Sequence, residues 1–136
     1  METLNDAALR QMLEQARVIA VVGHSDDPSR TSYRIASYLR RVGYTVIPVN
    51  PQVQMIDSQP SYPSLAAVPE PIDIVDVFRR SEHLLGIVEQ AAAVGAKMVW
   101  AQQGVSDPAA ARRAAELGIP LVMDNCIMVT HRRLLG

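Results

Sequence analysis

The chain has 136 residues, of which 49% are hydrophobic, 20% are charged and 4% are aromatic. This length predicts a single domain over residues 1–136, which should bury roughly two-thirds of its unfolded surface. The 13 basic and 14 acidic residues nearly cancel, which argues against a nucleic-acid binder and against an acidic disordered tail. The single cysteine, Cys126, excludes an internal disulfide and a multi-cysteine metal cluster, so we expect no metal site.

The sequence predicts neither a membrane span nor a secretion signal. No apolar run approaches the roughly 20 residues that cross a bilayer. Residues 1–13 alternate polar and apolar side chains and lack the basic start and apolar centre of a signal peptide. We therefore expect a cytoplasmic protein that has no membrane partner.

The hydrophobic pattern predicts alternating helices and strands. In chain order these are helix 4–16, strand 18–22, helix 32–42, strand 44–49, a mostly irregular connection 51–71 with at most one helical turn at 64–68, strand 72–78, helix 81–94, strand 97–101, helix 108–117 and strand 119–123. Three of these helices end at a glycine that leads into a strand, namely Gly43, Gly95 and Gly118. Asp107 followed by Pro108 is typical of a helix start.

The strands are mostly continuous apolar runs, which are typical of a parallel sheet covered by helices on both faces. Strand 72–78 differs because Asp73 and Asp76 interrupt it, and we expect both carboxyl groups to be solvated. Trp100 is expected in the core. The alternation predicts an α/β, three-layer Rossmann-like fold with a five-stranded parallel sheet in the order 3-2-1-4-5, plus the N-terminal amphipathic helix. Ligands of such folds bind at the carboxyl ends of the strands.

The loop after the first strand is suited to binding phosphate. Gly23 lets a ligand approach the backbone, and the following helix offers unpaired N–H groups at its positive end. Hydroxyl and guanidinium groups in the same segment come from Ser25, Ser29, Thr31, Ser32, Arg30 and Arg34. We expect Ser29 or Thr31 to cap the helix. His24 either donates to a phosphate or serves as an ordinary loop residue.

The sequence does not match the usual dinucleotide-binding pattern. Ser25 and Pro28 occupy the positions at which G-x-G-x-x-G requires glycine. Asn50 and Pro51 follow the second strand, where an acidic residue normally binds the ribose of NAD. Both departures argue against an ordinary nicotinamide-dependent dehydrogenase.

Several stretches together resemble a known family. They are residues 19–23, 25 and 28–30; 43–44, 46 and 48–51; 62–65; 75 and 77–78; 95–97, 99–100 and 102; and 126, 128, 131 and 134. Over residues 18–135 the chain is similar to the small CoA-binding proteins. These are single-domain relatives of the CoA-binding domain of the succinyl-CoA synthetase α subunit.

The resemblance implies a coenzyme A site at the carboxyl edge of the sheet. The implied pyrophosphate loop comprises Gly23, Ser25, Pro28, Ser29 and Arg30, and His24 and Ser32 in the same segment are further candidates for binding the cofactor. Asn50 and Pro51 would wall the adenosine, and Phe78 and Arg79 would line the groove beside it. Gln102 would lie on the path to the pantetheine arm. Gln52 stands where relatives often have lysine.

The expected function is therefore binding of coenzyme A or an acyl-CoA, more as a binder than as a catalyst. The synthetase's second domain, which carries the phosphorylated histidine, is absent, so we expect no ligase reaction. Three alternatives stay open: a small NAD(P)-binding oxidoreductase, a CoA-thioester enzyme that uses Cys126, and a structural partner subunit whose pocket is vestigial. His131 is expected at the surface or an interface. A homodimer or docking to a larger enzyme is the expected protein partnership.

Overall fold

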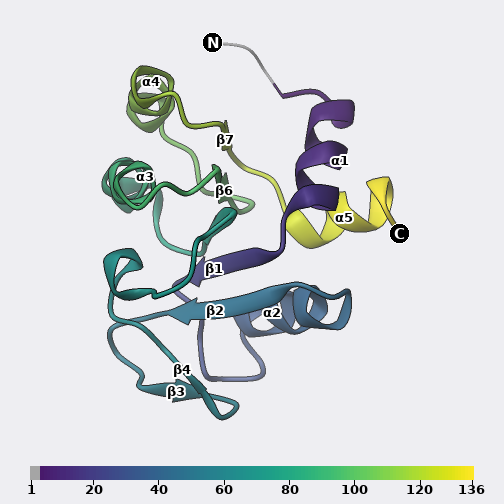
Figure 1. Cartoon of the computed structure of the whole chain (residues 1–136), viewed down its shortest axis with the longest axis vertical. Coiled ribbons are helices and arrows are strands. Elements are labelled where there is room, and N and C mark those ends of the chain that lie inside the picture. The colour runs from purple at the N-terminus through teal and green to yellow at the C-terminus, as the bar shows by residue number, and fades with distance from the viewer. Residues whose placement is uncertain (1–3) are drawn as a thin grey trace.

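A parallel sheet forms the centre of the structure, a computed structural model that describes residues 4–136 (Figure 1). Its five strands are β1 (Val18–Val22), β2 (Thr45–Val49), β5 (Ile74–Val77), β6 (Met98–Ala101) and β7 (Leu121–Val122). They lie in the order β2-β1-β5-β6-β7, and each neighbouring pair is parallel. The α/β fold with a five-stranded parallel sheet is confirmed.

The direction in which the strands are added reverses at β1. The chain passes from β1 to β2 on one side and then returns to place β5 on the other side. Tyr62 makes a parallel bridge to Val49 on the outer edge of β2, at the place of the third strand in a 3-2-1-4-5 sheet. Counted over the five regular strands alone, the order is 2-1-3-4-5. By either count the reversal lies between β1 and β5, where a ligand crevice is expected.

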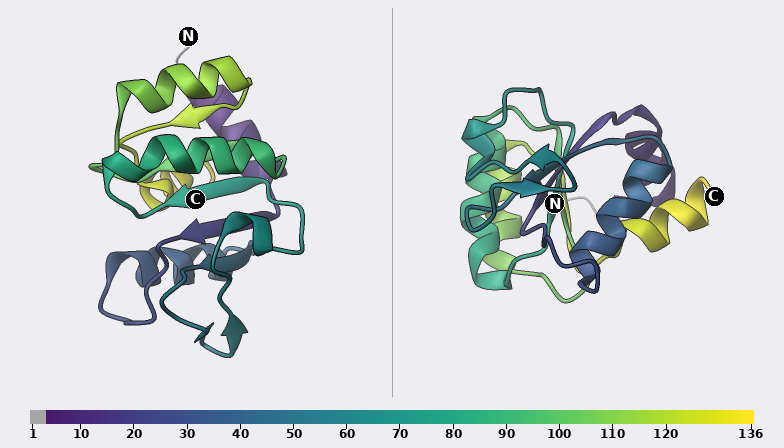
Figure 2. Two further views of the ribbon diagram at one scale, coloured as in Figure 1. Left: turned by 90° about the vertical axis from the view of Figure 1, so that its left-hand side faces the viewer. Right: turned by 90° about the horizontal axis from the view of Figure 1, so that it is seen from below.

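Helices cover both faces of the sheet (Figure 2). The helices α1 (Asp6–Gln15), α2 (Thr31–Arg41) and α5 (Ile127–Leu134) pack on one face, and α3 (Leu84–Ala93) and α4 (Pro108–Leu117) pack on the other. Successive strand residues point to opposite faces, so the sheet separates two apolar cores. Ile19, Val21 and Trp100 belong to the core under α2, whereas Ala20 and Val22 belong to the core under α3. Trp100 is fully buried, as expected.

A hairpin and a helix of the structure are absent from the pattern-based prediction. A hairpin of β3 (Met55–Ile56) and β4 (Gln59–Pro60) interrupts the connection expected to be irregular. Its strands have two residues each, too few for a hydrophobic alternation to be recognised. Helix α5 was missed because its buried face combines Ile127 with the polar residues Thr130 and His131.

The remaining boundaries agree within a few residues. Helix 81–94 begins as a 3₁₀ turn, η2 (Ser81–His83), and a second turn, η1 (Leu65–Ala67), lies where one helical turn was expected. The Asp107 side chain caps α4 by accepting a hydrogen bond from Ala109 N–H at 3.0 Å.

His131 is not a surface residue. It is 8% exposed, and its Nδ1 lies 2.7 Å from the hydroxyl of Tyr38, a residue of α2. Burial lowers the pKa of His131. This histidine therefore connects two helices inside one core, and the expectation of a surface or interface position was wrong.

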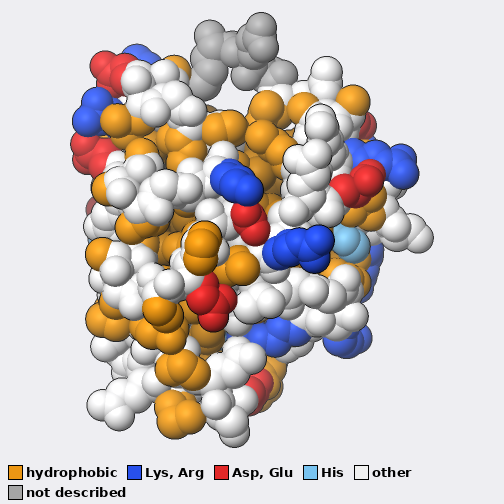
Figure 3. Space-filling view, in the orientation of Figure 1, with side chains coloured by type: hydrophobic (Ala, Val, Ile, Leu, Met, Phe, Trp, Pro, Cys, Tyr) orange, Lys and Arg blue, Asp and Glu red, His pale blue; other side chains and the backbone are white. Residues whose placement is uncertain are grey.

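Residues 4–136 include no helix that is both long and apolar enough to span a bilayer. The prediction that residues 1–13 are not a secretion signal falls partly on residues 1–3, which lie outside the described part of the chain. Figure 3 shows basic and acidic side chains interspersed on the face in view, which fits the formal net charge of -1.

Candidate functional site

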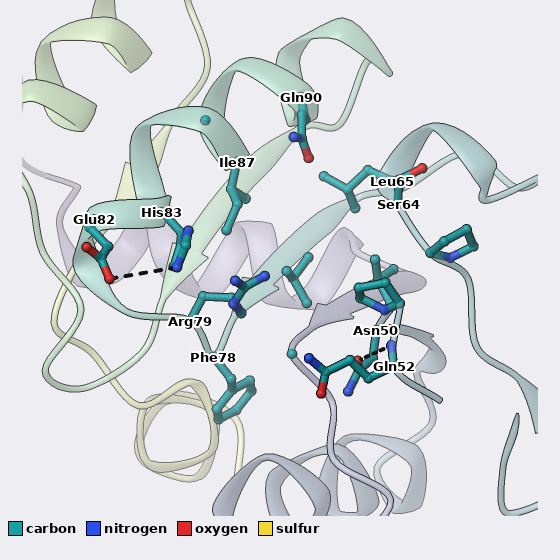
Figure 4. A pocket seen from close by; sticks show the side chains of 16 residues that line it. Asn50, Gln52, Ser64, Leu65, Phe78, Arg79, Glu82, His83, Ile87 and Gln90 are labelled. Atoms are coloured by element: carbon teal, nitrogen blue, oxygen red, sulfur yellow. Dashed lines mark hydrogen bonds and ion pairs between the residues drawn. The ribbon is translucent and has the colours of Figure 1, made fainter. Parts of the chain in front are cut away.

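A cavity of about 580 Å³ opens at the carboxyl ends of β1, β2 and β5 (Figure 4). Its lining residues are Val22, Gly23, Val49, Asn50, Pro51, Gln52, Pro63, Ser64, Leu65, Phe78, Arg79, Glu82, His83, Gly86, Ile87 and Gln90. The cavity lies beside the strand reversal between β1 and β5, where this fold places ligands. Of the predicted site residues, Gly23, Asn50, Pro51, Phe78 and Arg79 meet here.

Gly23 brings the ends of β1 and β5 into close contact. Its φ is +87°, and a Cβ at this position would lie 2.6 Å from the carbonyl oxygen of Phe78 and 3.2 Å from Cδ of Arg79. Its N–H donates to the carbonyl of Val49 at 2.9 Å, so the same residue also joins the end of β2. Only glycine fits both the conformation and the space.

The loop after Gly23 is held by its own side chains. Asp27 accepts hydrogen bonds from the N–H and the hydroxyl of Ser29, at 2.9 and 2.8 Å. The Ser32 hydroxyl accepts from the N–H of Ser25 at 3.0 Å. Pro28 and Arg30 are exposed on this loop. The predicted loop residues therefore form one folded segment, although they follow the first cavity rather than line it.

The expected cap of α2 is not formed. The N-cap residue is Arg30, which makes no side-chain capping hydrogen bond. Ser29 is instead engaged with Asp27, and Thr31 is already the first helical residue. The first-turn N–H groups of α2 thus lack a side-chain cap, which leaves the helix end suited to an anion.

His24 faces away from the cavity. It is fully buried, its Nδ1 donates to the carbonyl of Ser25 at 2.8 Å, and its Nε2 lies 3.3 Å from a guanidinium nitrogen of Arg40. Burial lowers the pKa of His24, and the charge of Arg40 acts in the same direction. The imidazole is neutral, and contacts with Ser25 and Arg40 engage both of its nitrogens. It therefore supports the loop from the interior of the protein. His24 can therefore meet a ligand only through its backbone.

Asn50 connects the end of β2 to this loop. Its Nδ2 donates to the carbonyl of His24 at 2.9 Å, and its Oδ1 accepts from the N–H of Gln52 at 2.9 Å. The side chain is thereby held at the wall of the cavity with both of its ends bonded. Asn50 therefore shapes the site, and a direct contact with a ligand would use its exposed surface.

A second cavity of about 540 Å³ lies on the face of the sheet that α2 and α5 cover. Its lining residues are Thr31, Ile35, Phe78, Arg79, Arg80, Gln102, Gln103, Val105 and Cys126. Phe78 and Arg79 line both cavities, so the two lie on either side of the end of β5. Gln102 and Cys126 belong to this second cavity, and the sequence patterns did not distinguish it from the first.

Asp76 is buried next to this second cavity, which corrects the expectation that it is solvated. Its side chain is 0% exposed on the central strand β5, and it accepts a hydrogen bond from Gln102 Nε2. Its second oxygen, Oδ2, has no hydrogen-bond partner within residues 4–136. Burial raises the pKa of Asp76 to about 8, and the hydrogen bond from Gln102 opposes the rise only in part. Asp73 is only partly buried and accepts from the N–H groups of Arg17 and Val18.

Sequence reasoning missed the contribution of α3 to the first cavity. Gln90 lines it from α3, and Glu82 and His83 line it from the 3₁₀ turn η2 that leads into α3, with His83 Nε2 3.9 Å from Glu82 Oε1. The expected absence of a multi-cysteine metal cluster follows from the single cysteine. In addition, no three His, Cys, Asp or Glu side chains within residues 4–136 are grouped to hold a metal ion.

These features define a Rossmann-like α/β domain with an open cavity at the reversal of its strand order. A family model described as CoA binding domain matches residues 17–132. The chain therefore belongs to the CoA binding domain family, as its resemblance to small CoA-binding proteins suggested.

Individual relatives agree with this assignment. The chain is 40% identical over 131 residues to the uncharacterized protein YneT of Bacillus subtilis (strain 168), covering 96% of this chain and 97% of YneT. A solved structure of a hypothetical protein from Pyrococcus horikoshii OT3 is 37% identical with a TM-score of 0.94, covering 100% and 99% of the two chains. An ADP-forming acetate–CoA ligase of Archaeoglobus fulgidus is 28% identical over 82% of this chain but only 18% of the ligase.

Proposed function

We propose that this protein binds coenzyme A or an acyl-CoA at the carboxyl edge of the sheet and has no ligase activity of its own. The observation that carries the proposal is the cavity beside the reversal between β1 and β5. Gly23 and residues at the carboxyl ends of three strands line this cavity. The family assignment favours coenzyme A over other nucleotides. The cytoplasm, where coenzyme A is used, is the proposed site of action.

The parts of coenzyme A have complementary surfaces here. The pyrophosphate fits the uncapped first turn of α2 and the exposed Arg30, because N–H groups and guanidinium forks both favour phosphate. The adenosine fits against Asn50 and Pro51 in the first cavity. No carboxylate follows β2 at this wall, so the 3′-phosphate of coenzyme A meets no repulsion from that position. Arg79 lines both cavities, so it can contact a ligand that crosses the end of β5.

Calorimetric titration of the purified protein with coenzyme A, and with NAD, NADP and ATP as controls, tests this proposal. We expect binding of coenzyme A alone among the four. Preference for NAD or NADP would support the oxidoreductase alternative, and silence toward all four would direct attention to a protein partner, either a second copy or a larger enzyme.

Replacing Arg79 with alanine is expected to weaken coenzyme A binding about tenfold, because a charge-assisted hydrogen bond to phosphate is lost. Arg112→Ala is the matched control, since Arg112 is exposed on α4 and lines neither cavity. Both Kd values come from the same titration. Equal Kd values for the two variants would show that Arg79 does not contact the ligand.

A CoA-thioester enzyme that uses Cys126 is the second candidate. The observation that favours it is the position of Cys126, which lines the second cavity and is the N-cap residue of α5. Turnover of an acyl-CoA that survives Cys126→Ser would exclude this cysteine as the nucleophile.

A further inference from the structure

The wall of the second cavity combines apolar side chains with the amide of a buried glutamine. Ile35, Phe78 and Val105 provide apolar surface, while Gln102, a residue that is 5% exposed, provides an amide. Because Phe78 and Arg79 line both cavities, a ligand that crosses the end of β5 can occupy the two cavities together. The cavity therefore suits the far end of an elongated ligand whose nucleotide lies in the first cavity.

Behind the wall of this cavity, Asp76 holds Gln102 in place. Gln102 Nε2 donates to one carboxyl oxygen of Asp76, and the other oxygen is buried without a hydrogen-bond partner in the described part of the chain. Buried polar groups are normally fully bonded, so an exception next to a cavity calls for an explanation. The neighbours of Asp76 in the sheet are Val21 and Trp100, and neither is charged. Burial raises the pKa of Asp76 to about 8, so an uncharged acid predominates at neutral pH and does not repel a ligand oxygen.

The amide of Gln102 has a donor to spare. Its NH₂ group carries two hydrogens, and one of them is used by Asp76. If the amide of Gln102 turns by 180°, so that Oε1 replaces Nε2 beside Asp76, the neutral acid of Asp76 donates to Oε1 and both amide hydrogens are free. In either arrangement Gln102 can donate a hydrogen bond to a ligand in the cavity. The complementary ligand group is a carbonyl oxygen that is surrounded by apolar atoms.

We propose that the second cavity holds the acyl group of a short-chain acyl-CoA, and that Gln102 donates a hydrogen bond to the thioester carbonyl. Asp76 is then a positioning residue, because it acts through Gln102. A long alkyl chain would cover this polar pair without bonding to it, which is why the acyl group is short. The inference rests on the proposed function, since the nucleotide must occupy the first cavity to direct the thioester across Phe78.

Comparing two ligands measures how much the thioester carbonyl contributes to binding. Acetyl-CoA and S-ethyl-CoA have the same length, but the second carries CH₂ in place of the thioester C=O. In calorimetric titrations of the wild-type protein we expect acetyl-CoA to bind about fivefold more tightly, the value of roughly one net hydrogen bond. Equal affinities would overturn the inference. So would binding of coenzyme A with exclusion of both S-substituted forms, whereas failure of all three to bind would overturn the proposed function itself.

Substitutions then test whether Gln102 is the hydrogen-bond donor to the thioester carbonyl. Gln102→Met keeps the length of the side chain and removes the amide, so the Kd ratio of the two ligands should fall to about one while S-ethyl-CoA binds as before. Asp76→Asn keeps a hydrogen-bonding partner for Gln102 and should preserve the ratio. Gln11→Met is the matched control, because Gln11 is exposed on α1 and lines neither cavity.

An unchanged ratio in Gln102→Met would overturn the role of Gln102. The ligand pair needs no variant, so the wild-type titration decides the inference even if Gln102→Met does not fold.

Discussion

Asp76→Asn is expected to raise the free energy of unfolding at pH 8, and the gain should shrink steadily as the pH falls toward 4. Asp76 is buried on the central strand, and burial raises its pKa from 3.8 to about 8. Between these two values the unfolded chain releases the proton while the folded chain keeps it. Each pH unit in this window therefore favours the unfolded state, by at most about 1.4 kcal/mol.

The window has defined limits. Below about pH 4 the carboxyl group is protonated in both states, so Asp76 carries no ionisation penalty. Above about pH 8 it is ionised in both states, and the penalty stays constant at a ceiling of roughly 5 to 6 kcal/mol. Asparagine cannot ionise, so the variant lacks this pH dependence. Urea unfolding of both proteins at several pH values measures the difference, and identical slopes against pH would contradict the buried acid.

Asp73→Asn provides a control of opposite sign. Burial raises the pKa of Asp73, but hydrogen bonds from the N–H groups of Val18 and Arg17, together with Lys97, outweigh it and lower the pKa below 3.8. The ionised form of Asp73 therefore stabilises the fold above the unfolded pKa, and this contribution is lost as the pH falls through the folded value. We expect Asp73→Asn to destabilise the protein at pH 7 and to lose its effect in acid. The two variants should diverge in opposite directions as the pH rises.

Gly23→Ala is expected to destabilise the protein by about 3 kcal/mol and to abolish coenzyme A binding. A side chain in the left-handed conformation costs roughly 1 kcal/mol, and the added Cβ would lie 2.6 Å from the carbonyl oxygen of Phe78. Relief of this contact requires the ends of β1 and β5 to separate. That movement would reshape the first cavity at its centre, so binding and stability should fall together.

Gly104→Ala separates the cost of the left-handed backbone conformation from the cost of the contact with Phe78. Gly104 has a φ of +85°, close to the +87° of Gly23, but a Cβ there would meet nothing within 4 Å. We expect a loss of about 1 kcal/mol, from the backbone conformation alone. Urea unfolding and coenzyme A titration of both variants provide the comparison. Equal losses at the two positions would mean that the contact with Phe78 carries no cost.

The candidate site could be predicted from the sequence only in part. The position of Gly23 after an apolar strand and before a helix indicated a close approach of backbone and ligand, and the structure places Gly23 in the first cavity. The role of His24 could not be predicted, because its side chain contacts Arg40, a residue of α2 that lies 16 positions further along the chain. Glu82 and His83 were not candidates, since only the folded chain brings the 3₁₀ turn η2 to the cavity.

The sequence by itself determined the fold class and most of the regular elements. Apolar periodicity is a local property, so strand 18–22 and helix 108–117 could be read with their bounds as observed. The family resemblance is likewise local, since it rests on short motifs taken in order.

Only the tertiary structure decided which polar residues are buried and which cavity each candidate lines. Asp76 interrupts an apolar strand as a solvated residue would, yet β5 lies between β1 and β6 and is covered on both faces. The place of a strand in a sheet depends on pairing with distant segments, which no local pattern records. For the same reason the separation of Gln102 and Cys126 from the first cavity, by Phe78 and Arg79, emerged only from the folded chain.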